Sequence, residues 1–194
     1  MRLLASISVL LSVVAATAPA SAQDMSTPIW WLDELRGGLY WHSVDHAGPD
    51  PLFGILDTTR GVDANVELLF TPFDLGDFNW LGEFRPHVGA TVNTNGLESM
   101  VYAGLSWTWH VFDGPVFIEG TFGGSINNWD PSNSHPDARN LGCNVLFRES
   151  ASVGVDITEQ ASIMLTAEHA SHAGLCNGRN EGLTNAGVRF GLKF

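Results

Sequence analysis

Apolar and polar residues alternate with a period of two along most of the chain that follows residue 34. Between residues 62 and 70 the even-numbered positions are apolar, whereas Asp63, Asn65 and Glu67 are polar. Two further segments, 101–110 and 185–194, repeat the pattern. Because successive side chains of a β-strand point to opposite faces, the alternation predicts strands with one apolar face and one polar face.

The pattern predicts eight strands, over residues 35–44, 62–71, 84–93, 99–110, 115–125, 141–155, 161–171 and 183–194. Short connections are predicted after the second, fourth and sixth strands, the first of them a turn through Pro72, Phe73 and Asp74. Longer polar loops follow the first, fifth and seventh strands, and the short "TNGLE" follows the third. We expect an all-β protein, an eight-stranded antiparallel barrel.

The two faces distinguish a transmembrane barrel from a soluble lipocalin-like carrier. The polar face holds small and hydrogen-bonding residues together with Glu67, Glu119, Arg148 and Arg189, which we expect to pair inside the barrel. A lipocalin needs an apolar lumen for its ligand, whereas a small membrane barrel is filled by polar side chains and apolar outside. The apolar face also carries three tryptophans where an interfacial girdle is expected, Trp41, Trp107 and Trp109. The transmembrane barrel is therefore favoured, and the soluble periplasmic carrier is the weaker alternative.

The N-terminus indicates export. Residues 1–22 combine Arg2, a short apolar run and Ala20-Ser21-Ala22, which is typical of a cleaved signal peptide, and residues 23–194 form one predicted barrel domain. Removing Arg2 changes the formal net charge from −12 to −13. So acidic a chain does not suit nucleic-acid binding, which needs a cationic surface.

The connections and the C-terminus indicate how the barrel sits in a Gram-negative outer membrane. Short turns face the periplasm in such barrels, so residues 45–61, 126–140 and 172–182 are expected outside. Cys143 and Cys176 then lie at the same end of neighbouring hairpins, and we predict a disulfide between them. The final strand ends on Phe194, an ending suited to recognition by the outer-membrane assembly machinery. Whether the barrel forms a homodimer is left open.

The stretch "AEHASHAGLCN" carries the candidate chemistry. Parity places His169 and Ser171 on the outer face of the seventh strand, at its outer rim. Polar side chains facing lipid are costly and therefore indicate a function. Residues two apart on one strand face are about 6.5–7 Å apart at Cα, so the imidazole can activate the serine hydroxyl as a nucleophile.

"HASHAGL" and the closing "NEGLTNAGVRFGLKF" resemble the His-x-Ser-Asn-Ala-Gly signature and last strand of PagL-type lipid A 3-O-deacylases, the acyloxyacyl hydrolase family. "LDELRGGLYWHSVD" and "VDANVELLF" are also similar to that family. The resemblance implies a Ser-His-acid site on the lipid-facing surface that hydrolyses an acyl ester of lipid A without a cofactor or metal. It makes Ser171 the nucleophile and His169 the base.

The sequence departs from the family signature at two positions. His172 replaces the asparagine linked to the oxyanion site, so an imidazole would donate there, beside the backbone amides of Ala173 and Gly174. Thr184 falls where the family has its acid, opposite His169 if the hairpin centres between residues 176 and 177.

Two glutamates are candidate replacements for the missing acid. Parity puts Glu149 on the lipid face of the sixth strand; a turn centred near residue 158 would pair it with Ala167, diagonal to His169. Alternatively, a slip in the strand register would turn the Glu149 side chain inward. Glu181, in the loop before the last strand, is the weaker candidate.

Two functions therefore follow from the sequence. The first is an outer-membrane esterase acting on lipopolysaccharide in the outer leaflet. The second is a non-catalytic surface barrel with a degenerate site. The inward-facing histidines His42, His87 and His110 lack the spacing of metal ligands and are expected to form interior hydrogen bonds.

Overall fold

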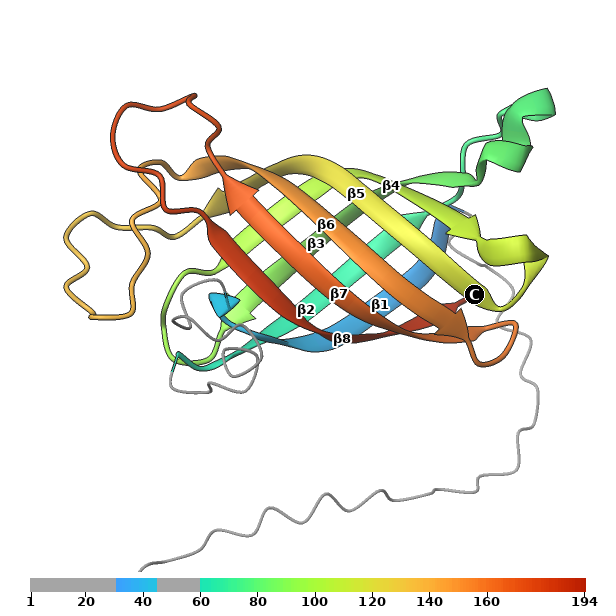
Figure 1. The fold of residues 1–194 in the computed structure, drawn as a ribbon, viewed down its shortest axis with the longest axis horizontal. Helices are drawn as coiled ribbons and strands as arrows, with labels where there is room; N and C mark the ends of the chain where they lie inside the picture. Colours follow the sequence, from blue (N-terminus) through green and yellow to red (C-terminus); the bar gives the residue numbers. More distant parts are fainter. Residues whose placement is uncertain (1–30, 45–59) are drawn as a thin grey trace, which may run out of the picture.

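The computed structural model of the protein describes residues 31–44 and 60–194. Eight antiparallel strands form a closed barrel, in which each strand pairs with its sequence neighbours and β8 pairs with β1 (Figure 1). The strands are β1 (Leu32–Trp41), β2 (Val62–Phe70), β3 (Glu83–Asn93), β4 (Met100–His110), β5 (Val116–Asn127), β6 (Val145–Asp156), β7 (Ala161–Ser171) and β8 (Leu183–Lys193). Closure leaves no unpaired sheet edge, as hydrocarbon requires. The predicted fold is confirmed; the predicted signal peptide lies outside the described residues.

Three strand bounds, which belong to two strands, differ from those predicted by more than two residues. β1 begins at Leu32 rather than 35, because a register shift between Leu32 and Glu34 interrupts the alternation there, and it ends at Trp41 rather than 44. β6 begins at Val145 rather than 141. Before it, Gly142 has a φ of +71° and Cys143 is disulfide-bonded, which takes the chain out of the ladder.

The β2–β3 connection has the predicted position but contains an element that was not predicted. This element is a 3₁₀ helix, η2 (Gly76–Leu81). Side-chain oxygens stabilise this helix, since the amide of Gly76 donates to Asp74 at 2.9 Å and that of Leu75 donates to Asn79 at 2.9 Å. A second 3₁₀ segment, η3 (Val111–Asp113), lies between β4 and β5. No helix within residues 31–44 and 60–194 is long and apolar enough to cross a membrane.

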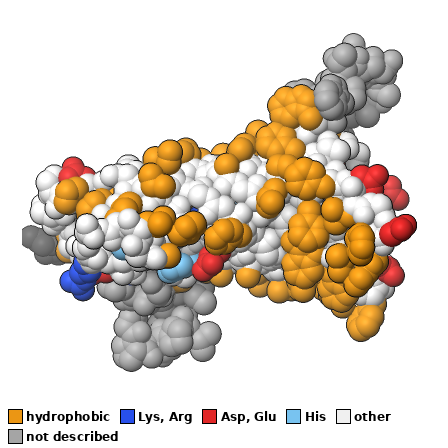
Figure 2. All heavy atoms as spheres, turned by 90° about the horizontal axis from the view of Figure 1, so that it is seen from above, with side chains coloured by type: hydrophobic (Ala, Val, Ile, Leu, Met, Phe, Trp, Pro, Cys, Tyr) orange, Lys and Arg blue, Asp and Glu red, His pale blue; other side chains and the backbone are white. Residues whose placement is uncertain are grey.

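The outer wall is apolar, as the alternation predicts. Hydrophobic side chains extend along it, while charged side chains lie mostly towards the two ends (Figure 2). Its exposed members include Val66, Val101, Phe122, Val153, Leu165 and Phe190. Tryptophans lie near both rims, with Trp41 at the end of β1 and Trp107 and Trp109 at the opposite end of the barrel on β4. An apolar wall with tryptophans near both rims is typical of a β-barrel that is surrounded by lipid.

The barrel interior is filled by charged side chains, the most buried of which are Glu34, Arg36, Glu67, Arg85, Glu119, Arg148, Glu168 and Arg189. Arg189 donates to Glu67 at 2.7 Å, and Arg148 donates to Glu168 at 2.8 Å. Arg36 pairs with Glu34 and Glu119. A buried charge is tolerated when it is paired and hydrogen-bonded, and these residues meet that condition. The predicted interior pairing is confirmed, and this lumen does not suit an apolar ligand.

The connections divide between two ends of the barrel, which we call the loop end and the turn end. The loop end carries the connections β1–β2, β3–β4, β5–β6 and β7–β8, and the turn end carries the other three. In Figure 1 the β5–β6 and β7–β8 loops project from the same end of the barrel, opposite η2 and the C-terminus. The loop end is the one expected outside the cell.

Candidate active site

His169 and Ser171 lie near the loop end of β7, on its lipid-facing side, and both are partly buried. His169 pairs with Thr184 of β8 in the strand register, as the sequence predicts. The Nδ1 atom of His169 is 2.8 Å from the Thr184 hydroxyl oxygen, and the direction of this hydrogen bond depends on the imidazole tautomer. A neutral hydroxyl group therefore stands where the resemblance places an acid.

Glu149 lies on the lipid-facing side of β6, as parity predicts, but its predicted register is wrong. It pairs directly with His169, not with Ala167. The β6–β7 turn centres on residue 159, one residue later than expected, because Asp156 pairs with Ser162 across it. The hydroxyl of Thr158 accepts the amides of Gln160 and Ala161, which stabilises this turn.

The corrected register puts the Glu149 carboxylate closer to His169 than the diagonal placement would. Side chains directly opposite one another on antiparallel strands have Cβ atoms about 4.5–5.5 Å apart. Within the described residues, Glu149 makes no hydrogen bond or ion pair. The carboxylate is therefore a neighbouring negative charge that is not bonded to the imidazole.

Ser171 has no hydrogen bond to His169 among the described residues. The two side chains lie on one face of β7 at positions two apart. Among the described residues, no hydrogen bond holds the Ser171 side chain away from His169. Hydrogen bonds between catalytic groups are often long or unformed without substrate. The arrangement therefore permits the hydrogen bond between Ser171 and His169 that proton transfer needs, but this bond is not formed in the structure.

The turn after Ser171 is built around His172. The imidazole of His172 is buried, and its Nδ1 accepts the amide of Gly174 at 3.1 Å. The carbonyl of His172 accepts the amide of Leu175 at 2.7 Å, and Ala173 adopts a φ of +46°. Of the three residues expected to serve an oxyanion site, His172 thus binds the amide of Gly174, and Ala173 lies exposed between them.

Glu181 is bonded to residues of the β5–β6 and β7–β8 loops. Its carboxylate accepts the amide of Asn140 at 2.8 Å through one oxygen and pairs with Arg179 at 2.8 Å through the other. Its main chain also exchanges hydrogen bonds with the β5–β6 loop, as its amide donates to the carbonyl of Asn140 at 2.9 Å. The structure gives Glu181 the role of joining two loops.

The predicted disulfide between Cys143 and Cys176 is confirmed, with Cα atoms 6.1 Å apart. A second link between the same loops was not found from sequence. Arg139, which is buried, donates from Nε to the carbonyl of Gly182 at 2.9 Å and from its terminal nitrogen Nη2 to that of Glu181 at 2.7 Å. No sequence motif marks this arginine, because its partners are backbone carbonyls of a distant loop.

The three histidines expected to face inward lie in the barrel interior or close to it. His42 is bonded to Asp63 at 2.9 Å, and His110 to Asp156 at 2.9 Å. His87 is buried against the ring of Tyr102. Within residues 31–44 and 60–194, no group of three or more His, Cys, Asp or Glu side chains is arranged to hold a metal ion.

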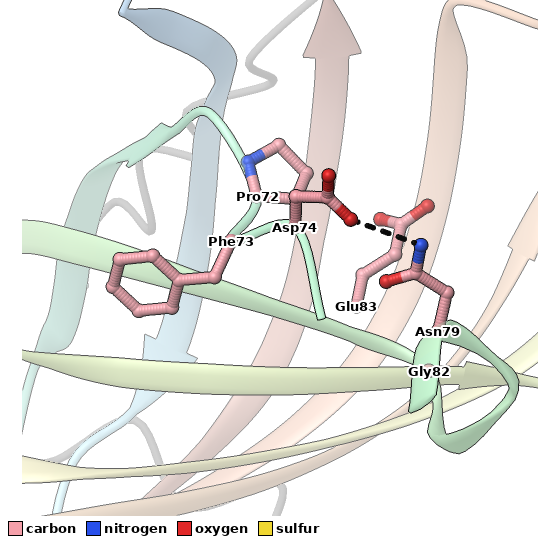
Figure 3. Close-up of a pocket in the computed structure, with 6 residues that line it drawn as sticks. All are labelled: Pro72, Phe73, Asp74, Asn79, Gly82 and Glu83. Atoms are coloured by element: carbon pink, nitrogen blue, oxygen red, sulfur yellow. Dashed lines mark hydrogen bonds between the residues drawn. The ribbon is translucent and has the colours of Figure 1, made fainter. Parts of the chain in front are cut away.

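A surface hollow of about 500 Å³ lies at the turn end, far from His169 and Ser171. Figure 3 shows its lining, with a hydrogen bond between the side chains of Asp74 and Asn79, both of the β2–β3 connection. The residues that line it are Pro72, Phe73, Asp74, Asn79, Gly82 and Glu83. They include neither a serine nor a histidine, and we do not regard this hollow as the active site.

Comparisons with known proteins agree with this geometry. The family described as lipid A 3-O-deacylase (PagL) matches residues 61–193. Among solved structures, the chain is similar to the outer membrane enzyme PagL, with 15% identity and a TM-score of 0.54, over 84% of this chain and 99% of that chain. It is also similar to the N-terminal β-barrel domain of Pseudomonas aeruginosa OprF, with 10% identity and a TM-score of 0.53, over 84% and 97% of the two chains.

A comparison with curated protein sequences gives no match. At these identities the likeness to solved structures concerns the fold alone, that of outer-membrane barrels. The family match, however, covers more than half of the chain, and it includes β7 and β8. The chain therefore belongs to the PagL family of lipid A 3-O-deacylases.

Proposed function

We propose that this protein removes an ester-linked acyl chain from lipid A in the outer leaflet, with Ser171 as nucleophile and His169 as general base. One observation carries the proposal. Both side chains lie on the lipid-facing side of β7 at the loop end, and the imidazole is held by Thr184. A lipid in the outer leaflet can reach this site laterally, whereas a water-soluble ester would have to enter the hydrocarbon region.

Thr184 is bonded to Nδ1 of His169, which leaves Nε2 to act as the base. With the Thr184 hydroxyl oxygen accepting a hydrogen bond from Nδ1–H, Nε2 is the unprotonated nitrogen. Nε2 then takes the proton of the Ser171 hydroxyl while Oγ forms a bond to the acyl carbon. As the tetrahedral intermediate collapses, the bond between that carbon and the sugar oxygen breaks, and the imidazolium returns the proton to the sugar oxygen. Water hydrolyses the acyl-enzyme by the same steps.

The backbone amide of Ala173 is our candidate for the oxyanion donor. The amide of Gly174 is bonded to His172, and the carbonyl of His172 is bonded to Leu175. These two bonds fix the turn that contains Ala173, an exposed residue with a left-handed φ of +46°. A donor that is fixed before substrate arrives stabilises the negative oxygen without reorganisation. His172 would thus act by ordering the turn.

Glu149 supplies the negative charge that Thr184 does not. It lies directly across from His169 on the lipid-facing side. A carboxylate directly across the strand pair favours the imidazolium that forms during proton transfer, even without a hydrogen bond. The surrounding lipid screens the attraction between the two charges only weakly. The triad of the family is thereby divided between two neighbours of His169, one on β8 for orientation and one on β6 for charge.

Ser171→Ala tests the proposal. The purified protein in detergent should release a fatty acid from lipid A, and the substitution should lower that rate by about 10³-fold or more, because the nucleophile is lost. Mass spectrometry of the lipid A product measures both. The matched control is Ser162→Ala, on the same strand but buried in the interior, which should retain activity. Equal product from wild type and Ser171→Ala would reject the proposal.

A non-catalytic barrel is the second candidate, and one observation favours it. No carboxylate is bonded to His169 among the described residues. A lipophilic fluorophosphonate probe separates the two candidates, because it labels only an activated serine. Labelling of wild type but not of Ser171→Ala or His169→Gln supports the esterase, and absence of labelling supports the non-catalytic barrel.

A further inference from the structure

Gly182 immediately precedes β8, at the end of the β7–β8 ladder. The register pairs His169 with Thr184 and Ala170 with Leu183, and Gly182 is the residue before Leu183. Gly182 is buried and has a left-handed φ of +66°. A Cβ atom added at this position would lie against the imidazole of His169.

The imidazole of His169 occupies the space that a side chain at residue 182 would fill. A Cβ atom added to Gly182 would lie 2.8 Å from Cε1 and 3.2 Å from Nε2 of His169. The edge of the ring that carries Cε1 and Nε2 therefore packs against Gly182. Thr184 holds the other nitrogen, Nδ1, at 2.8 Å. Thr184 thus sets the ring by a hydrogen bond, and Gly182 sets it by having no side chain.

Arg139 fixes the backbone at this point. Its guanidinium donates to the carbonyls of Gly182 at 2.9 Å and Glu181 at 2.7 Å. Its own amide donates to the carboxylate of Glu98 at 2.8 Å, which anchors the arginine to the β3–β4 turn. Charged donors to backbone carbonyls in a buried setting make strong, directional bonds. The β5–β6 loop therefore determines where the two residues that precede β8 lie.

We propose that Gly182 and Arg139 are positioning residues for His169, an inference that rests on the proposed function of Ser171 and His169. Neither residue touches the reacting atoms. Because Gly182 has no side chain, the imidazole has space to direct its base nitrogen towards Ser171. Arg139 fixes the backbone around that space. A displacement of a catalytic group by about 1 Å can lower a rate by about 10²-fold, so their loss should appear in kcat.

Two substitutions of Gly182 separate the added side chain from the backbone cost. Gly182→Ala adds the Cβ and also strains a left-handed φ; Gly182→Asn adds the Cβ at a lower backbone cost, since asparagine tolerates this region. The control is Gly178→Ala in the same loop, at a φ of +118° with no atom within 4 Å of the added Cβ. We expect both Gly182 variants to lower kcat by about 10- to 100-fold at little changed KM, and Gly178→Ala to retain kcat.

Arg139→Lys tests the backbone anchor. Lysine retains the charge but cannot bond both carbonyls with the geometry of a guanidinium. We expect a fall in kcat smaller than that of Gly182→Ala, with the heat-modifiable folded barrel and the Cys143–Cys176 disulfide still formed. Both are checked by electrophoresis with and without reductant.

The ring itself provides a readout that does not depend on turnover. In protein labelled at histidine, the Cε1–H resonance of His169, assigned with His169→Gln, should shift in both Gly182 variants and stay in place in Gly178→Ala. Unchanged kcat and an unchanged resonance in Gly182→Ala would overturn the inference, as would equal effects in Gly178→Ala. If wild type does not act on lipid A, the proposed function fails, while the resonance still decides whether Gly182 positions the ring.

Discussion

Thr184 stands where the resemblance to the family places its acid. A carboxylate beside the base both orients the imidazole and stabilises its positive form, whereas a hydroxyl can only orient it. The bond between Thr184 and Nδ1 of His169 retains the first role. Glu149, one strand away on the other side, is placed to supply part of the second. The site is therefore expected to be active but slower than one with a bonded acid.

Substitutions of Thr184 test this division. Thr184→Val removes the acceptor of Nδ1 and should lower kcat by about 10-fold or more, since the imidazole loses its orientation and tautomer. Thr184→Glu restores a carboxylate at the family position and should raise kcat. Initial rates of fatty acid release, measured under saturating lipid A, check both. A Thr184→Val enzyme as fast as wild type would contradict the role given to this hydroxyl.

Glu149→Gln completes the comparison as a double-mutant cycle. In the wild-type background the substitution should slow the reaction, because the imidazolium loses its neighbouring charge. In the Thr184→Glu background it should have little effect, because a bonded carboxylate then carries that charge. Additive effects in the two backgrounds would show that the two side chains act independently.

At the level of single residues, part of the site could be predicted from the sequence. Parity alone places His169, Ser171 and Glu149 on the lipid-facing side, and pairing of His169 with Thr184 follows from a hairpin centred between Cys176 and Asn177. Gly182 and Arg139 were not predicted. Their importance depends on a close approach through space and on bonds to backbone carbonyls, neither of which leaves a periodic trace in a sequence.

At the level of elements, the strands were more predictable than their connections. β7 begins and ends where the alternation predicts, because both of its ends coincide with a change of pattern. The β6–β7 turn centres one residue later than expected, and the β2–β3 connection contains η2, which the pattern does not predict. In both cases hydroxyl, carboxylate or amide side chains bond the local backbone, and such bonds decide turn length without altering the hydrophobic pattern.

The link between the β5–β6 and β7–β8 loops leads to a prediction about stability. Cys143 and Cys176 are 33 residues apart, and a crosslink closing such a loop stabilises a fold by about 3–4 kcal/mol in the chain-entropy description. The double variant Cys143→Ala, Cys176→Ala should therefore lose about 3 kcal/mol of unfolding free energy. Urea titration in detergent micelles, followed by tryptophan fluorescence, measures it.

Reductant provides the control for this experiment. Wild type treated with dithiothreitol should unfold at the same urea concentration as the double variant, and the double variant should not respond to reductant. If removing the disulfide leaves the unfolding midpoint unchanged, the Arg139 and Glu181 bonds alone hold the two loops together.

At the level of the whole molecule, the loop end of the barrel is closed by a buried acid–base cluster. His42, just beyond the end of β1, is bonded to Asp63 of β2 and to Glu98 of the β3–β4 turn. Burial by itself would lower the pKa of His42, but the hydrogen bonds to Asp63 and Glu98 raise it to about 9. Three separate parts of the barrel wall therefore share one protonated imidazole.

This cluster predicts how stability depends on pH. Because the pKa of His42 is higher in the folded state than its ordinary value of 6.5, its contribution is complete below about pH 6.5 and is lost as the pH rises through 9. A shift of this size corresponds to about 3 kcal/mol. The unfolding free energy should fall by up to that amount between these two values. His42→Gln should flatten the dependence, and His135→Gln, in an exposed loop, should not.

The interior arginines and carboxylates have a further consequence for the cell that makes this protein. Their side chains pair across the barrel axis and exclude solvent from its middle. Small solutes therefore find no passage through the protein, unlike through a porin of larger circumference. The barrel therefore adds no pathway for such solutes to the membrane in which it lies.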